Sequence, residues 1–171
     1  MRHNHLTRRQ SLLLLGAGAS LLVTGAARAA GNMTMHKSAT CGCCSKWAAR
    51  MREAGFTVEE VVEADMDAVK TKLGVPKAMQ SCHTALIDGY IVEGHVPADA
   101  INRLLAERPK VTGVAAPGMP SGSPGMEMGE AEVFTLYLFD AASSREFGKW
   151  RGAKPASSVL SGASLPPDKP R

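Results

Sequence analysis

The sequence has few aromatic residues: Phe, Trp and Tyr together make up 5% of its 171 residues. It also lacks any stretch in which basic and aromatic side chains alternate, which is the pattern of a surface that binds nucleic acid. We therefore expect no nucleic-acid partner. No internal repeat is visible, so a repeat architecture is not expected either.

A long apolar run is also missing. The run over residues 12–23 is too short, and too rich in Gly and Ala, to span a membrane comfortably. No cysteine lies near the small residues that follow this run. We therefore expect neither a stable membrane helix nor a lipid anchor.

The same run has the features of an export signal. Arg8 and Arg9 precede it, and Ala27-Arg28-Ala29 has the A-x-A form of a cleavage site. The arginine pair suggests the twin-arginine export route. We predict that residues 1–29 are a signal peptide of the twin-arginine type, cleaved near Ala29, and that the mature protein lies in the periplasm.

The positive charge of the chain belongs to this leader. Four of the 20 basic residues and none of the 16 acidic residues lie in it, so the remainder is close to neutral. The basic balance of the whole chain therefore indicates no anionic partner. The remaining length, about 142 residues, suits one domain that can bury a core without disulfides. The four cysteines then need another explanation.

Between residues 32 and 109 the pattern alternates between strands and helices. Strands are predicted over 32–39 and 56–64, a hairpin over 84–96, and helices over 65–74 and 97–109. Another helix follows Cys41, because Cys44, Trp47, Ala48 and Met51 have helical spacing. This succession predicts an α/β fold of the thioredoxin-like type over residues 30–142, a small mixed sheet with helices on both faces.

Beyond residue 109 the signals weaken. Residues 109–129 are rich in Gly, Pro and Ser and contain three methionines, which predicts a long functional loop. Residues 132–140 alternate as one more strand, which we expect at the edge of the sheet. From residue 143 to 171 we expect a disordered C-terminal tail.

Three thiols open the first predicted helix. Cys41 and Cys44 have the C-x-x-C spacing of a redox pair, and a helix N-terminus favours the thiolate form of cysteine. A metal-free thiol–disulfide oxidoreductase using this pair is therefore one interpretation. Such an enzyme has no use for Cys43, because a third thiol would reshuffle the disulfide.

A metal site explains the third thiol better. Thiolates select soft ions such as Cu(I), and they also bind Zn(II). The adjacent Cys43 and Cys44 cannot easily point at one tetrahedral ion, which argues against mononuclear zinc and favours a polynuclear Cu(I)–thiolate site. Zinc stays the weaker alternative.

Further candidate ligands lie later in the chain. In a thioredoxin-like arrangement Cys82 and His83 face the start of the C-x-x-C helix, with His83 where thioredoxins usually carry a cis-proline. Packing alone could also explain both residues, and His95 could equally be a surface histidine. Thioether sulfurs bind Cu(I), although they also fill gaps in a core. The remaining candidates are His95, Met119, Met126 and Met128.

Three stretches of the sequence, residues 36–56, 73–105 and 113–127, together resemble the CopG-type copper-resistance proteins of bacterial periplasms. The resemblance covers about residues 33–127. It implies a thioredoxin-like fold, copper bound at the CGCC motif and joined by Cys82-His83, and a copper-cluster oxidoreductase role in copper tolerance. We also expect periplasmic copper-handling or redox proteins as partners. The extension after Lys149 departs from the family pattern.

Overall fold

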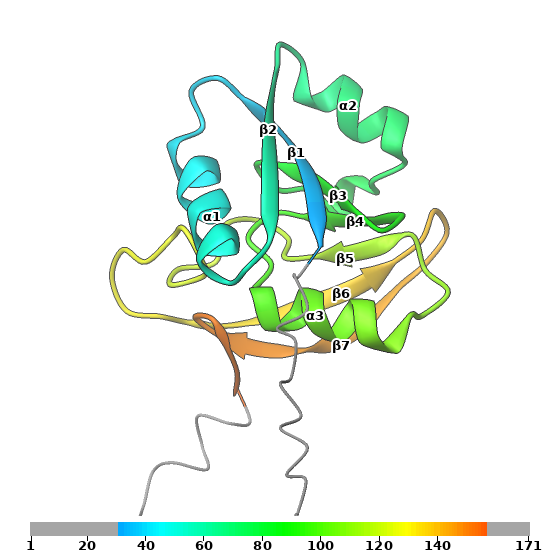
Figure 1. Cartoon of the computed structure of the whole chain (residues 1–171). Helices are drawn as coiled ribbons and strands as arrows, with labels where there is room; N and C mark the ends of the chain where they lie inside the picture. The colour runs from blue at the N-terminus through cyan, green and yellow to red at the C-terminus, as the bar shows by residue number, and fades with distance from the viewer. Residues whose placement is uncertain (1–30, 157–171) are drawn as a thin grey trace, which may run out of the picture.

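A computed structural model describes residues 31–156 as a mixed α/β structure (Figure 1). The predicted signal peptide, residues 1–29, and the last part of the expected tail, residues 157–171, lie outside the described residues. None of the described helices is long and apolar enough to cross a membrane.

The described elements follow the predicted order through residue 107, namely strand, helix, strand, helix, hairpin and helix. They are β1 (Asn32–Ser38), α1 (Gly42–Glu53), β2 (Thr57–Glu63), α2 (Met66–Leu73), the 3₁₀ turn η1 (Lys77–Met79), β3 (Thr84–Ile87), β4 (Tyr90–Glu93), α3 (Ala98–Glu107), β5 (Gly113–Ala115), β6 (Val133–Phe139), β7 (Ser144–Arg151) and β8 (Lys154–Pro155).

All eight described strands form one sheet in the order β2-β1-β3-β4-β5-β6-β7-β8. The β1–β2 and β4–β5 pairs are parallel and the others are antiparallel, so the predicted mixed α/β class is confirmed. The hairpin between β3 and β4 turns at Asp88 and Gly89, as predicted, and both residues have positive φ, as a tight hairpin turn requires.

Hydrophobic packing lies on both faces of the sheet. Successive strand residues point to opposite faces, so Val92 and Val114 join the main cluster while Ile91 and Ala115 join a second one. The helices α1 and α3 pack on the main cluster, and the segment from the end of α2 through η1 packs on the second. The buried face of α1 consists of the four residues predicted from helical spacing, Cys44, Trp47, Ala48 and Met51.

The C-terminal part of the chain differs from the prediction. The strand β6 lies between β5 and β7 rather than at the sheet edge, and β5 lies inside the expected loop of residues 109–129. Residues 144–155, expected in a disordered tail, form β7 and β8. The sequence hides β7 because its two buried residues, Phe147 and Trp150, are three apart. A bulge opposite Leu136 and Tyr137 breaks the alternation that predicts strands.

The strand β7 is fastened to α3 by side chains. The Trp150 indole N–H donates to Asp99 Oδ1 at 3.0 Å. The Arg103 guanidinium lies 4.1 Å from the centre of the Phe147 ring and donates to the Phe147 carbonyl oxygen at 2.8 Å. Residues 144–151 therefore belong to the folded core.

We predict that a chain ending at Ser143 does not fold, whereas a chain ending at Ala156 does. The shorter chain loses the buried Phe147 and Trp150, and each aromatic truncation alone removes about 3–5 kcal/mol. Native domains are stable by only about 5–15 kcal/mol in total. Thermal unfolding followed by circular dichroism checks this, and a cooperative transition in the shorter chain would show that β7 is dispensable.

Candidate metal centre

The fold brings the two cysteine-bearing segments together at one end of β1. The strands β1 and β3 pair antiparallel, with His36 opposite Thr84. The CGCC segment follows the end of β1, and Cys82-His83 immediately precedes the start of β3. Cys41 is the N-cap of α1, and Cys43 and Cys44 lie in its first turn. The predicted juxtaposition of these segments is therefore found.

The four cysteine sulfurs form one compact group. The sulfur atoms of Cys41, Cys43, Cys44 and Cys82 all lie within 4.8 Å of one another. Cys41 and Cys44 are joined by a disulfide, and Cys43 and Cys82 are free thiols. The Cys43 sulfur lies 3.5 Å from that of Cys41 and 3.9 Å from that of Cys82. The C-x-x-C pair can thus be oxidised within a group that also has the composition of a soft-metal site.

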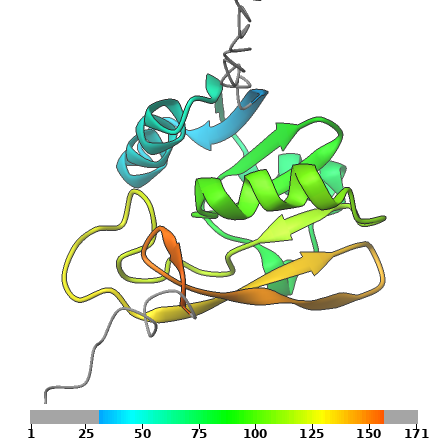
Figure 2. The same cartoon turned by 60° about the horizontal axis from the view of Figure 1, so that its bottom comes forward.

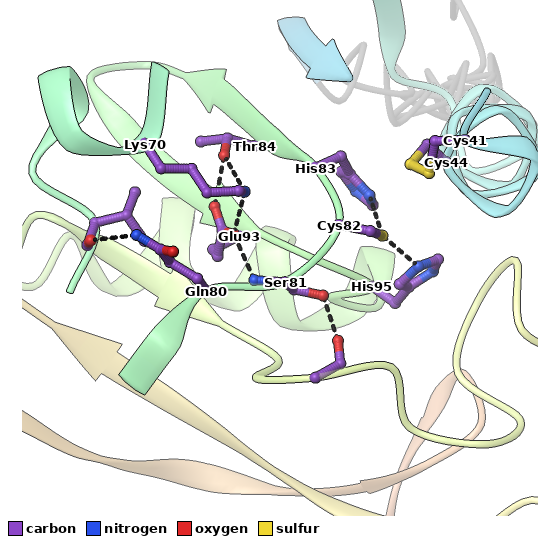
Figure 3. Close-up of polar contacts among 12 residues, drawn as sticks. Cys41, Cys44, Lys70, Gln80, Ser81, Cys82, His83, Thr84, Glu93 and His95 are labelled. Carbon is purple, nitrogen blue, oxygen red and sulfur yellow. Dashed lines mark hydrogen bonds and ion pairs between the residues drawn. A yellow bond between two sulfur atoms is a disulfide. The ribbon is translucent and has the colours of Figure 1, made fainter. Parts of the chain in front are cut away.

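Two histidines lie against the Cys82 sulfur, one on each side (Figure 3). His83 Nδ1 is 3.3 Å from that sulfur and His95 Nε2 is 3.0 Å from it. The two rings meet edge to face at 5.1 Å between centres. His95 is fully buried, so it is not the surface histidine that the sequence left possible.

The orientation of His95 is set by the loop between β5 and β6. Its Nδ1–H donates to the Pro124 carbonyl oxygen at 2.7 Å, which leaves Nε2 with a free lone pair directed at Cys82. Metal-binding histidines usually donate their other ring N–H to a carbonyl or carboxylate in this way. His95 is therefore held as a ligand would be.

His83 is buried against Trp47, with ring centres 4.5 Å apart. Its Nε2 is the one buried side-chain nitrogen or oxygen, among residues 31–156, that has no hydrogen-bond partner. A buried imidazole without full hydrogen bonding is unfavourable unless another group binds it. The orphaned Nε2 belongs to the ring whose Nδ1 lies 3.3 Å from the Cys82 sulfur, and an imidazole in this position fits a metal ion.

Burial also sets the protonation of these groups. Burial, together with the neighbouring Cys43, raises the pKa of the Cys82 thiol to about 12. Burial lowers the pKa of His83 far below its usual value and lowers the pKa of His95 as well. At neutral pH both imidazoles are therefore uncharged and able to bind a metal, and a metal would displace the proton of Cys82.

The three loop methionines lie at the surface or near it. The side chains of Met119 and Met128 are 56% and 72% exposed, and Met126 is half-buried. Two of the three thus lie outside the buried group of thiols and imidazoles. Met126 directly follows Gly125, the residue at which the loop meets the start of α1.

The loop that carries them lies across the start of α1 (Figure 2). A Cβ atom on Gly125, which has φ of +85°, would lie 2.7 Å from the Trp47 nitrogen and 2.8 Å from the Cys43 oxygen. An ion pair between Arg50 and Glu127, 2.8 Å long, joins the same two segments. Only glycine permits this close approach, which also places the Pro124 carbonyl against His95.

A buried ionic network behind the centre was missed by sequence reasoning. Lys70 on α2 donates to Glu93 Oε1 at 2.5 Å and to Thr84 Oγ1 at 2.9 Å, and all three side chains are buried. The Thr84 hydroxyl and the Ser81 backbone N–H donate to the same carboxylate at 2.6 and 2.7 Å. A lysine on a short helix normally faces water, so the sequence carries no signal for this network.

This network holds the backbone on both sides of Cys82-His83. Ser81 precedes the pair and Thr84 follows it, and both bind Glu93, which ends β4. Burial raises the pKa of Glu93, and the adjacent Lys70 ammonium opposes that shift. The ion pair therefore keeps a carboxylate where it can fasten the Cys82-His83 segment.

Fold and site together define a mixed α/β protein with a buried thiol–imidazole cluster of metal-binding composition. Two solved structures titled copper resistance protein CopG, forms 1 and 2, are similar to it, at 45% and 44% identity and a TM-score of 0.66 each. The matches cover 71% and 70% of this chain and 98% of the solved chains. The chain belongs to the family of the CopG copper-resistance proteins.

The other two comparisons add little to this assignment. Residues 79–126, which include Cys82, His83 and His95, match the family model described as protein of unknown function, DUF411. No curated protein matches the chain. Family membership and the cysteine cluster both fit copper binding.

We predict that Gly125→Ala destabilises the protein by about 1–3 kcal/mol more than Gly129→Ala. The two glycines share a loop and a φ near +85°, so both substitutions carry the same backbone strain. Only the Gly125 Cβ meets the backbone of α1, whereas the Gly129 Cβ has its nearest neighbour at 4.0 Å. Chemical denaturation of both variants measures the difference, and equal losses would mean that the loop does not need this contact.

Lys70→Met should destabilise the protein by about 3–5 kcal/mol at pH 7, because it leaves Glu93 buried without its cation. The exposed Lys72 on the same helix gives the matched control, Lys72→Met, which we expect to be nearly neutral. The folded-state pKa of Glu93 already lies above its ordinary value of 4.5, and it rises further in Lys70→Met, because the ammonium that opposes burial is gone and the hydrogen bonds from Thr84 and Ser81 remain.

A carboxyl with a raised folded-state pKa contributes its stability below the unfolded pKa and loses it as pH rises through the folded pKa. The loss caused by Lys70→Met should therefore be smallest below about pH 4.5 and grow above it. Urea unfolding of wild type and variant from pH 4 to 8 measures this. A difference that stays constant with pH would contradict the buried-carboxylate account.

Proposed function

We propose that this protein is an exported, periplasmic copper-binding protein that serves copper resistance by binding Cu(I) in a polynuclear thiolate site. The observation that carries this proposal is the group of four cysteine sulfurs within 4.8 Å of one another. Family membership in the CopG copper-resistance proteins supports copper as the ion. Copper is here the cargo of the protein.

The four sulfurs favour several ions over one. Cys43 and Cys44 are adjacent, and their sulfurs belong to the same group as those of Cys41 and Cys82. Thiolates readily bridge soft cations, so a cluster uses all four sulfurs. We assign bridging roles to the four cysteines in their reduced state, in which Cys41 and Cys44 are free thiols.

The imidazoles complete this site. His83 and His95 flank Cys82 and are neutral at physiological pH, which suits them as nitrogen ligands. Met126, beside the loop contact with α1, and the exposed Met119 and Met128 are proposed as accessory soft donors for incoming copper. Zinc remains the alternative ion, and periplasmic copper-handling or redox proteins are the proposed partners.

A second candidate function is favoured by the Cys41–Cys44 disulfide. This bond joins the C-x-x-C pair at the N-terminus of α1, the position of the redox pair in a thioredoxin-like fold. The pairing β2-β1-β3-β4, with β1 and β2 parallel, supports assigning that fold here. The protein would then be a thiol–disulfide oxidoreductase, or couple thiol chemistry to copper oxidation and reduction.

The two functions make different use of Cys43. We predict that the fully reduced protein binds more than one equivalent of Cu(I) in a titration against a competing chelator, and that Cys43→Ser strongly weakens this binding. A plain dithiol enzyme would keep much of its disulfide-reductase activity after that change. His36→Gln, at a histidine paired with Glu63 on β2, is the matched control and should leave copper binding unchanged.

An endpoint at one equivalent would contradict the polynuclear site. Normal Cu(I) binding by Cys43→Ser would remove the ligand role of the third thiol and favour the oxidoreductase instead.

A further inference from the structure

In the described structure only two of the four cysteine sulfurs are available to bind a metal ion. The disulfide uses the sulfurs of Cys41 and Cys44, which leaves Cys43 and Cys82 as free thiols. Disulfide sulfurs lack the negative charge that makes thiolates strong metal ligands. The proposed polynuclear site therefore needs a reduced protein.

A second set of donors is untouched by the disulfide. Cys82, His83 and His95 each offer one atom, and these three atoms lie within 4.8 Å of one another. The set shares only Cys82 with the four-sulfur group and contains no member of the CGCC motif. Its three side chains come from the segment before β3 and from the loop after β4, so closure of the disulfide on α1 does not remove any of them.

This second set differs chemically from the first. It offers two neutral imidazoles and one thiolate, whereas the four-sulfur group offers four anionic sulfurs. Imidazole suits borderline divalent ions such as Cu(II) and Zn(II), and two histidines with one cysteine form a common trigonal arrangement for copper. One divalent ion with this set carries a single net positive charge, which is a small charge for a buried site.

The protein environment prepares these donors for a metal. His95 is oriented by its hydrogen bond to Pro124, and the Cys82-His83 backbone is fixed on both sides by Glu93. His83 Nδ1 lies 3.3 Å from the Cys82 sulfur, and the Nε2 of the same buried ring has no hydrogen-bond partner. Such pre-oriented donors bind a metal ion more tightly, because little freedom remains to be lost on binding.

From these observations we infer that Cys82, His83 and His95, which join the four-sulfur site in the reduced protein, form by themselves a mononuclear site that holds one borderline divalent ion, Cu(II) or Zn(II), while Cys41 and Cys44 are disulfide-bonded. The site deepens the proposed function, since it rests on the same copper-handling role but not on the polynuclear cluster. The redox state of Cys41 and Cys44 then selects which class of ion the protein binds.

The test uses Co(II), a borderline divalent ion that thiolates do not reduce, and the full chain in its disulfide form. Cys43→Ser is the background, so that Cys82 is the single thiol left when the disulfide is intact. A thiolate-to-cobalt charge-transfer band in the near ultraviolet then reports coordination by Cys82 alone. Histidines elsewhere in the chain cannot produce this band.

We expect the band to appear in the Cys43→Ser background and to vanish when Cys82→Ser is added. Adding His95→Gln or His83→Gln should weaken Co(II) binding by more than about 100-fold, beyond the 10–100-fold loss typical of outer-shell partners. Adding His36→Gln should change nothing, because that histidine lies on β1 and pairs with Glu63. Melting curves of the metal-free variants establish that each one is folded.

Absence of the band in the folded Cys43→Ser protein would overturn the inference, whatever the histidine variants do. A band that persists unchanged in both histidine variants would overturn it as well. Neither result would affect the proposed polynuclear site, because that site is measured with Cu(I) on the reduced protein with Cys43 present. Conversely, a Cu(I) endpoint at one equivalent would leave the Co(II) result standing.

Discussion

The carboxylate of Glu93 is the group on which the arrangement of the centre depends. Glu93 is the last residue of β4 and accepts a hydrogen bond from the ammonium of Lys70 on α2. It also accepts hydrogen bonds from Ser81 and Thr84, the two residues that flank Cys82-His83. A buried ion pair of this kind adds little net stability compared with apolar packing. The ion pair instead fixes the positions of the Cys82 thiol and the His83 imidazole relative to α1.

The opposite side of the centre is fixed by backbone rather than by charge. The start of α1 holds Cys41, Cys43 and Cys44, and the loop bearing Pro124 and Gly125 lies directly against it. That loop reaches His95 through a single carbonyl oxygen. Cys41 and Cys44 lie at the start of α1, whereas the segment of Cys82 and His83 is held by Glu93, so oxidation of Cys41 and Cys44 need not disturb that segment.

Much of the fold and of the candidate site could be predicted from the sequence. The face of α1 and the Asp88-Gly89 hairpin have strong local signals, and the likeness of the element order to a thioredoxin arrangement placed the CGCC motif opposite Cys82. The burial of His95 was not predictable, since its partner Pro124 is distant in sequence and is offered by a loop without periodicity. The strand β7 was missed because its bulge breaks the alternation of buried and exposed residues that predicts a strand. The buried Lys70 was missed because nothing in the sequence distinguishes it from a lysine exposed to solvent.

The wide sequence separation of the centre's components has a consequence for folding. The donors and their supports come from α1, from the segment before β3, from the loop after β4 and from the loop before β6. Contacts between such distant segments form late, because the loops between them must close first. A nascent or partly unfolded chain therefore offers the three CGCC thiols without Cys82, His83 and His95, and the assembled centre is a property of the finished fold.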